Sequence, residues 1–227
     1  MEYIDKETLV MKNDLNFYTR VYDNFLSDDI CDQYVDYFEE TMEKDKDVVF
    51  DTSICYGNEV GSAGQPICGN CNCQRMNPMG FDRFESLNEI ALGKFLGVID
   101  QYKKDIGLHH LQWPEKYGYE EFRMKRFLVT DGSTEAEQFK DHVDVSSHAA
   151  AKRFLIMMVY LNDDFGGGET VFPIFQDVIK PKKGSLLIFP PMWTYLHRGN
   201  PPLAPGYAKY FLMTYLNYTD VLFKSRT

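Results

Sequence analysis

The stretch KRFLIMMVYLN, residues 152–162, consists mainly of the large aliphatic and aromatic side chains that are typical of a buried β-strand. Alternation along such a strand would place four side chains on one face: Phe154, Ile156, Met158 and Tyr160. Similar short apolar runs recur in the same half of the chain, separated by turn-forming Gly, Pro, Asp and Asn. They are FRMKRFLV (122–129), GETVFPI (168–174), GSLLIFP (184–190) and AKYFLMTYLNY (208–218). Strands at such regular spacing predict a sandwich or a jelly roll.

The first half of the chain has helical periodicity instead. Ser27 is a suitable N-cap, acidic residues fill the turn that follows, and apolar side chains then recur at helical spacing as far as Met42. A second helix is predicted from Phe84 to about Ile106. Between the two helices, residues 51–80 are rich in Gly, Asn, Ser and Pro and show no sustained period, which favours a long loop that acts as a lid.

Together these patterns predict a single α+β domain over residues 1–227. Residues 1–113 would form mainly a supporting helical layer with the lid loop, and residues 114–227 would form a jelly-roll core against which the helices pack.

The charge of the chain limits the function classes. Its 227 residues carry a formal net charge of −10 at pH 7, which is the wrong sign for a non-specific nucleic-acid binder. No apolar run approaches the roughly 20 residues of a membrane span, and the first residues lack the basic and apolar regions of a signal peptide. We therefore expect a soluble cytoplasmic protein that binds neither nucleic acid nor a membrane. The sequence does not indicate its oligomeric state.

The stretch HVDVSSH, residues 142–148, contains candidate metal ligands. In a strand, His142 and Asp144 project to the same side, although a His-x-Asp pair alone is common by chance. Of the remaining histidines, His148 lies in a polar turn, two precede the predicted β core, and His197 is expected at the end of a strand. Two imidazoles and one carboxylate form a facial triad, which suits Fe(II) and leaves coordination positions open for chemistry.

Four blocks of the β half strengthen this interpretation because they occur in one order along the chain. They are HVD (142–144), VYLNDDFGGGETVFP (159–173), IKPKKGSLLIFP (179–190) and HRGNPPLAPGYAKY (197–210). This pattern resembles the Fe(II)- and 2-oxoglutarate-dependent dioxygenases, and among them the prolyl 4-hydroxylase-like branch. The resemblance implies a double-stranded β-helix in which His142, Asp144 and His197 hold Fe(II). It also implies that O2 and 2-oxoglutarate are consumed, that succinate and CO2 are released, and that ascorbate supports turnover.

The same resemblance assigns residues to the cosubstrate. Lys209 would neutralise the distal carboxylate of 2-oxoglutarate, and Tyr160 would hydrogen-bond the same group. Phe127 stands where many relatives have a tyrosine, which would remove one hydrogen bond near the cosubstrate. The interval from His197 to Lys209 is also longer than in most prolyl 4-hydroxylases. Two further cations, Lys152 and Arg153, flank a turn and are expected to face water.

The resemblance further implies a prolyl residue of a peptide or protein as the substrate. Two alternatives stay open: the same chemistry on a free amino acid or another side chain, and a non-catalytic metal-binding jelly-roll module. Trp193 and Tyr195, just before His197, would either line the substrate groove or pack in the core.

Four of the five cysteines lie in the predicted lid, at Cys55, Cys68, Cys71 and Cys73. Their spacing suggests a zinc site, but no second spaced pair or histidine completes a usual zinc pattern. Free thiols are therefore the expectation for an intracellular lid.

Overall fold

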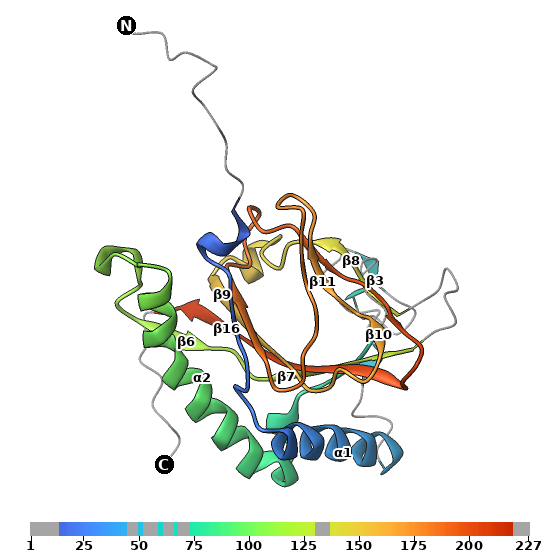
Figure 1. Ribbon diagram of the computed structural model, residues 1–227. Coiled ribbons are helices and arrows are strands. Elements are labelled where there is room, and N and C mark those ends of the chain that lie inside the picture. The colour runs from blue at the N-terminus through green and yellow to red at the C-terminus, as the bar shows by residue number, and fades with distance from the viewer. Residues whose placement is uncertain are drawn as a thin grey trace, which may run out of the picture.

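The computed structural model of the protein describes residues 14–44, 50–51, 59–60, 66–67, 73–129 and 137–219. Two antiparallel sheets enclose an apolar interior, and two helices lie along the outside of the larger sheet (Figure 1). This mixture of helices and antiparallel strands agrees with the predicted α+β class, and the two-sheet arrangement is consistent with a jelly roll.

The helices begin and end close to the predicted positions. The two long helices are α1 (Asp28–Lys44) and α2 (Glu85–Asp105). Five short 3-10 helices are η1 (Leu15–Phe17), η2 (Pro78–Gly80), η3 (Asp82–Phe84), η4 (His110–Gln112) and η5 (His148–Ala150). No helix in the described part of the chain is both long and apolar enough to cross a lipid bilayer.

The larger sheet has eight strands. In spatial order they are β1 (Arg20–Tyr22), β13 (Leu186–Phe189), β9 (Arg153–Tyr160), β16 (Ala208–Tyr218), β7 (Arg123–Leu128), β5 (Gln74–Met76) and β2 (Phe50–Asp51), with β6 (Tyr117–Tyr119) also paired to β16. The smaller sheet has the order β12 (Asp177–Ile179), β11 (Thr170–Phe172), β14 (His197–Gly199) and β8 (Phe139–His142). Two separate pairs are β10 (Gly166–Gly167) with β15 (Pro202–Leu203), and β3 (Glu59–Val60) with β4 (Pro66–Ile67).

The first half of the chain contributes more than the helical layer that its periodicity predicts. Strand β1 pairs with β13 at one edge of the larger sheet, and β5 and β2 extend it beyond β7 at the other edge. These strands are two or three residues long, too short to produce an alternating pattern that distinguishes them from loop. The segment predicted as a lid loop, 51–80, therefore includes strand β5 and helix η2, while much of that segment lies outside the described residues.

Strand β9 separates two apolar cores. Ile156, Met158 and Tyr160 face the interior between the sheets, whereas the alternate residues face the helices. Phe154, expected on the inner face, packs instead against Trp113 with ring centroids 5.2 Å apart. The pairing of β16 with β9 shifts register at this point: Leu216 pairs with Leu155, but the next residue, Asn217, pairs with Arg153. Phe154 has no partner on β16 and is the extra residue of a β-bulge.

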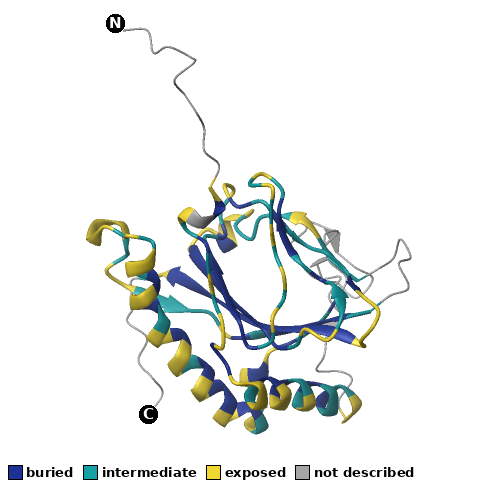
Figure 2. Ribbon diagram, viewed as in Figure 1, coloured by how far each residue is buried: buried dark blue, intermediate teal, exposed yellow. Residues whose placement is uncertain are grey.

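The helices cover the outer face of the larger sheet through one stripe each. In α1 the buried residues are Cys31, Tyr34, Phe38 and Thr41, and in α2 they are Leu87, Asn88, Ala91, Phe95, Ile99 and Tyr102. The opposite faces of both helices are exposed, and the central strands beneath them are almost wholly buried (Figure 2). The helices thus close the outer core and leave the inner core to the two sheets.

The prediction that Arg153 faces water is wrong. Its side chain is only 5% exposed, and its Nε and Nη2 atoms donate to the two carboxylate oxygens of Glu120 at 2.7 and 2.9 Å. Arg123 forms a second ion pair with Glu120. Lys152, by contrast, is exposed as expected. A buried arginine is stable here because the paired carboxylate replaces its water shell.

We expect the change Glu120→Gln to lower the free energy of unfolding by about 3 kcal/mol at pH 7, because the buried Arg153 and the partly buried Arg123 would lose their carboxylate. Burial alone would raise the pKa of Glu120, but the hydrogen bond and charge of Arg153 together with the charge of Arg123 lower that pKa to about 2. The ionised Glu120 carboxylate therefore contributes its full stabilisation of the folded state above the ordinary pKa of 4.5. This stabilisation is lost as the pH falls toward 2. Urea unfolding at several pH values measures it.

The neighbouring change Glu121→Gln is the matched control. Glu121 is exposed and accepts one hydrogen bond from Asn77 Nδ2 at 2.8 Å. We expect it to change stability by less than about 0.5 kcal/mol at any pH. Equal destabilisation by the two variants would contradict the role given to the Glu120 network.

Candidate active site

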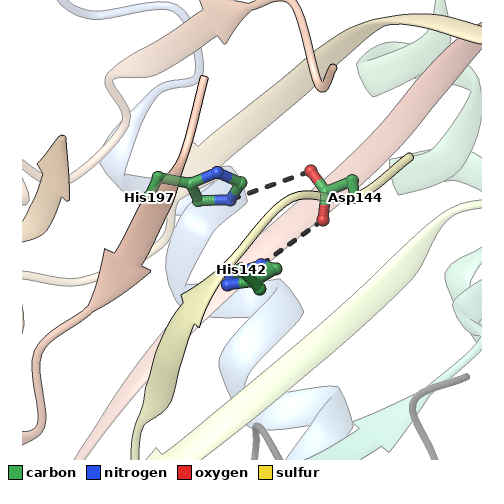
Figure 3. Close-up of side chains that lie close together, drawn as sticks. All are labelled: His142, Asp144 and His197. Carbon is green, nitrogen blue, oxygen red and sulfur yellow. Dashed lines mark ion pairs between the residues drawn. The ribbon is translucent and has the colours of Figure 1, made fainter. Parts of the chain in front are cut away.

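Three side chains from the smaller sheet converge at the mouth of the inner core. His142 is the last residue of β8, His197 is the first residue of β14, and the two are paired directly across these strands. Asp144 follows two residues after His142, just beyond the end of the strand rather than on its face as expected. All three side chains point into one gap (Figure 3).

The distances within this group are those of a preformed ligand set. His142 Nε2 lies 3.5 Å from Asp144 Oδ1, and His197 Nε2 lies 3.8 Å from Asp144 Oδ2. One donor atom from each of the three residues lies within 4.8 Å of the other two, which is close enough for a single ion to contact all three. In the described part of the chain this is the only such cluster of His, Cys, Asp and Glu side chains.

Backbone carbonyls orient both imidazoles. His142 Nδ1 lies 2.8 Å from the carbonyl oxygen of Lys140, and His197 Nδ1 lies 3.0 Å from that of Tyr195. A neutral imidazole that donates from Nδ1 keeps its lone pair on Nε2, the atom that faces Asp144 in both cases. Each histidine is therefore held in the tautomer that can bind a metal.

The protonation states also suit a divalent cation. Burial, followed by the charge of His142, lowers the pKa of His197 to about 4, so this ring is neutral at physiological pH. Burial would raise the pKa of Asp144, but His197, His142 and Lys125 together hold it below its ordinary value. Asp144 Oδ2 is buried without a hydrogen-bond partner in the described part of the chain. The neutral nitrogen of His197 and an anionic oxygen that needs a partner fit a metal ion.

A narrow cavity of about 50 Å³ extends from this group into the inner core. Lys209, on β16, lines it and is only 3% exposed. Its Nζ donates to the carbonyl oxygen of Gly168 at 2.6 Å and lies 5.5 Å from the ring centre of Tyr160. Burial lowers the pKa of Lys209 to about 7, with the nearby charge of Glu169 opposing the shift. The cavity thus has a ligand cluster at its mouth and a buried amine within it.

Tyr160 is fully buried behind the wall of the cavity. Its hydroxyl lies 2.7 Å from Thr170 Oγ1, and burial raises its pKa well above the ordinary value. Thr170, rather than Tyr160, is among the residues that line the cavity. The structure therefore places a second hydroxyl between the predicted tyrosine and the space a cosubstrate would occupy.

Sequence reasoning missed four polar residues of the cavity wall: Lys125, Thr170, Asn200 and Tyr215. Two of them carried a usable signal, because Lys125 shares a strand face with Phe127 and Thr170 shares one with Phe172, both of which are in the inner core. A polar residue at an inward position of an apolar strand indicates a lined cavity.

The remaining candidates lie apart from the cavity. Tyr195 is buried in the inner core, and Trp193 is 78% exposed; neither lines the cavity. His148 lies exposed in η5, as the polar turn predicts. Cys73 is buried, whereas Cys55, Cys68 and Cys71 lie outside the described residues.

One segment of the chain, residues 127–217, is similar to a known protein family. Residues 127–217 match the family model of the 2OG-Fe(II) oxygenase superfamily. The matched segment contains His142, Asp144, His197 and Lys209. Among curated proteins, no sequence match was found.

Solved structures show the same fold over most of the chain. The viral collagen prolyl hydroxylase of Paramecium bursaria Chlorella virus-1, in a 2OG complex, is 20% identical with a TM-score of 0.61, and the match covers 89% of this chain and 97% of that one. A Trichoplax adhaerens prolyl hydroxylase, in complex with a hypoxia inducible factor oxygen degradation domain peptide fragment, is 15% identical with a TM-score of 0.63, covering 89% and 84%. A Pseudomonas putida prolyl-4-hydroxylase is 15% identical with a TM-score of 0.53, covering 89% and 93%. Residues 127–217 are thus similar to the 2OG-Fe(II) oxygenase superfamily, and the chain shares the fold of these prolyl hydroxylases over most of its length.

Proposed function

We propose that this protein hydroxylates a prolyl residue of a peptide or protein, using Fe(II), 2-oxoglutarate and O2 and releasing succinate and CO2. The observation that carries the proposal is the arrangement of the cavity, with the His142, Asp144 and His197 cluster at its mouth and the amine of Lys209 inside it. In this proposal residues 1–227 form a single catalytic domain with a double-stranded β-helix core.

The three side chains at the mouth would hold Fe(II). Fe(II) bound there would supply the activation of O2 that couples oxidative decarboxylation of 2-oxoglutarate to hydroxylation of a C–H bond. The histidines contribute neutral nitrogens whose orientation the carbonyls of Lys140 and Tyr195 maintain, and Asp144 contributes the negative charge. With three protein ligands, coordination positions stay open for the cosubstrate and O2.

Lys209 would neutralise the distal carboxylate of 2-oxoglutarate inside the cavity. Thr170 lies on the same wall and would add a hydroxyl donor, while Tyr160, bonded to Thr170 Oγ1, would orient that hydroxyl. The surrounding side chains Phe127, Phe189 and Phe211 exclude water, which strengthens the attraction between the amine and a carboxylate. The protein thus supplies binding and orientation rather than a general acid or base.

Two observations support a peptidyl prolyl substrate. The three solved structures compared above are named as prolyl hydroxylases, and one of them contains a bound peptide fragment. The net charge of −10 does not favour a nucleic-acid substrate.

Incubation of the purified protein with Fe(II), ascorbate, 2-oxoglutarate and proline-rich peptides should yield succinate and add one oxygen atom to a proline. Tandem mass spectrometry locates the oxygen, and peptides with alanine at the modified position serve as controls. Oxygen on another residue or on a free amino acid would favour the alternative substrates. Absence of coupled turnover with every proline peptide would contradict prolyl hydroxylation.

A further inference from the structure

Lys125 is a second buried lysine in the same cavity. It lies on β7, is 7% exposed, and lines the cavity together with Lys209 and the three metal-ligand candidates. Its Nζ lies 4.5 Å from the ring centre of Phe139 on β8 and 5.9 Å from that of Phe211 on β16. The aromatic faces lower the cost of burying this cation, and they direct it across the interior toward the smaller sheet.

The two lysines occupy different ends of the cavity. In the pairing of β7 with β16, Lys209 faces Phe127 and Phe211 faces Lys125, so the lysines are diagonal neighbours roughly 7–8 Å apart at their Cα atoms. Lys209 contacts Gly168 and the charge of Glu169, on the side of β11. Lys125 Nζ instead lies over the ring of Phe139, which stacks on His142 with ring centroids 3.7 Å apart. Lys125 therefore belongs to the end that carries the metal-ligand candidates.

On the wall of the cavity that β7 forms, position 127 carries no hydroxyl. Phe127 has the inward position on β7 next to Lys125, and it stacks on Phe211 with ring centroids 5.7 Å apart. On the cavity-facing side of β7, the hydrogen-bond donor nearest to this position is the amine of Lys125. A cation is a stronger partner for a carboxylate than a phenol hydroxyl.

We propose that Lys125 binds the 1-carboxylate of 2-oxoglutarate at the metal end of the cavity, while Lys209 binds the 5-carboxylate. This inference rests on the proposed function. The two ammonium groups lie toward different ends of one cavity, so a dicarboxylate bound along that cavity meets one ammonium group at each end.

The test measures binding rather than turnover, by calorimetric titration of the full chain loaded with Mn(II). Three ligands separate the two ends of the cosubstrate. 2-Oxoglutarate has both carboxylates, 2-oxopentanoate has a methyl group in place of the 5-carboxylate, and 4-oxopentanoate has a methyl group in place of the 1-carboxylate. The variants are Lys125→Met and Lys125→Gln, which remove the charge, Lys125→Arg, which keeps it, and Lys209→Met as the matched comparison.

We expect Lys125→Met and Lys125→Gln to raise the Kd of 2-oxoglutarate and 2-oxopentanoate by about 10–100-fold, the usual effect of losing a charged hydrogen bond. They should leave the Kd of 4-oxopentanoate unchanged, and Lys125→Arg should restore most of the affinity. Lys209→Met should raise the Kd of 2-oxoglutarate and 4-oxopentanoate, the two ligands that have the 5-carboxylate, and should leave the Kd of 2-oxopentanoate unchanged. Because two ligands are compared on one variant, loss of folded protein does not alter the ratio of their Kd values.

An unchanged Kd of 2-oxoglutarate in Lys125→Met would overturn the inference. An unchanged Kd together with a raised KM for the peptide would assign Lys125 to an acidic group of the substrate instead. Equal weakening of all three ligands would also overturn it, because it would indicate a merely structural lysine. If the unaltered protein binds no 2-oxoglutarate, the proposed function itself fails, which is a distinct outcome.

Discussion

Replacing Asp144 with alanine should abolish coupled turnover of 2-oxoglutarate, with a loss of at least about 100-fold. Asp144 is the anionic member of the ligand cluster, and its two carboxylate oxygens lie 3.5 and 3.8 Å from the Nε2 atoms of His142 and His197. Without it, two neutral imidazoles would have to hold a divalent cation alone. The expected cause is loss of the metal, so titration with Mn(II) should show a weakened Kd in parallel with the loss of succinate production.

The control for this change is Asp141→Ala. Asp141 lies one residue before His142 on β8, but its side chain is exposed and pairs with Arg198 at 3.3 Å on the surface. We expect this variant to retain Mn(II) binding and turnover. If Asp144→Ala turned over normally, the assignment of the metal ligands would be wrong. If the unaltered protein bound metal and a partner without ever turning over 2-oxoglutarate, the chain would act as a binding module.

Removing the amine of Lys209 should weaken the binding of 2-oxoglutarate strongly. In Lys209→Met the 5-carboxylate would enter an apolar cavity without a counter-charge, and we expect the Kd to rise by about 100-fold. Lys209→Arg keeps the charge and is the conservative comparison. The readout is the Kd of 2-oxoglutarate on the Mn(II)-loaded protein.

The affinity should also depend on pH, with a sign set by the buried lysine. Burial lowers the pKa of Lys209 to about 7, the charge of Glu169 opposes that shift, and only the protonated amine attracts a carboxylate. Above pH 7, each unit of pH should therefore raise the Kd of 2-oxoglutarate about tenfold, until the pKa of the anion-bound lysine is reached. Below pH 7 the Kd should be constant with respect to this group.

Titrations between pH 6 and 9 would measure this dependence, and Lys209→Arg should be insensitive to pH because guanidinium stays protonated. 2-Oxopentanoate, which lacks the 5-carboxylate, should likewise be insensitive to the ionisation of Lys209. The same pH profile in Lys209→Met as in the unaltered protein would contradict the assignment of the titrating group.

Local patterns predicted much of this molecule. The alternation predicted along residues 152–162 holds from Ile156 to Tyr160 in β9, and most of the stripe from Phe84 to Ile106 lies on the buried face of α2. These predictions succeeded because period and capping are properties of neighbouring residues. The ligand candidates were also found, because His142, Asp144 and His197 stand within blocks that resemble a known family.

Long-range pairing supplied what local pattern could not. The direct pairing of His142 with His197 joins strands 55 residues apart in sequence, and it brings their imidazoles to one ion. The burial of Arg153 depends on Glu120, which lies on another segment, and the hydroxyl of Tyr160 meets Thr170 from another strand. Lys125 reads in sequence as a polar residue of a strand, and its place beside the metal ligands appears only when β7 is packed against β8 and β16. A side-chain period shows that two faces differ, whereas the chemistry of a cavity depends on which faces the folded sheets bring together.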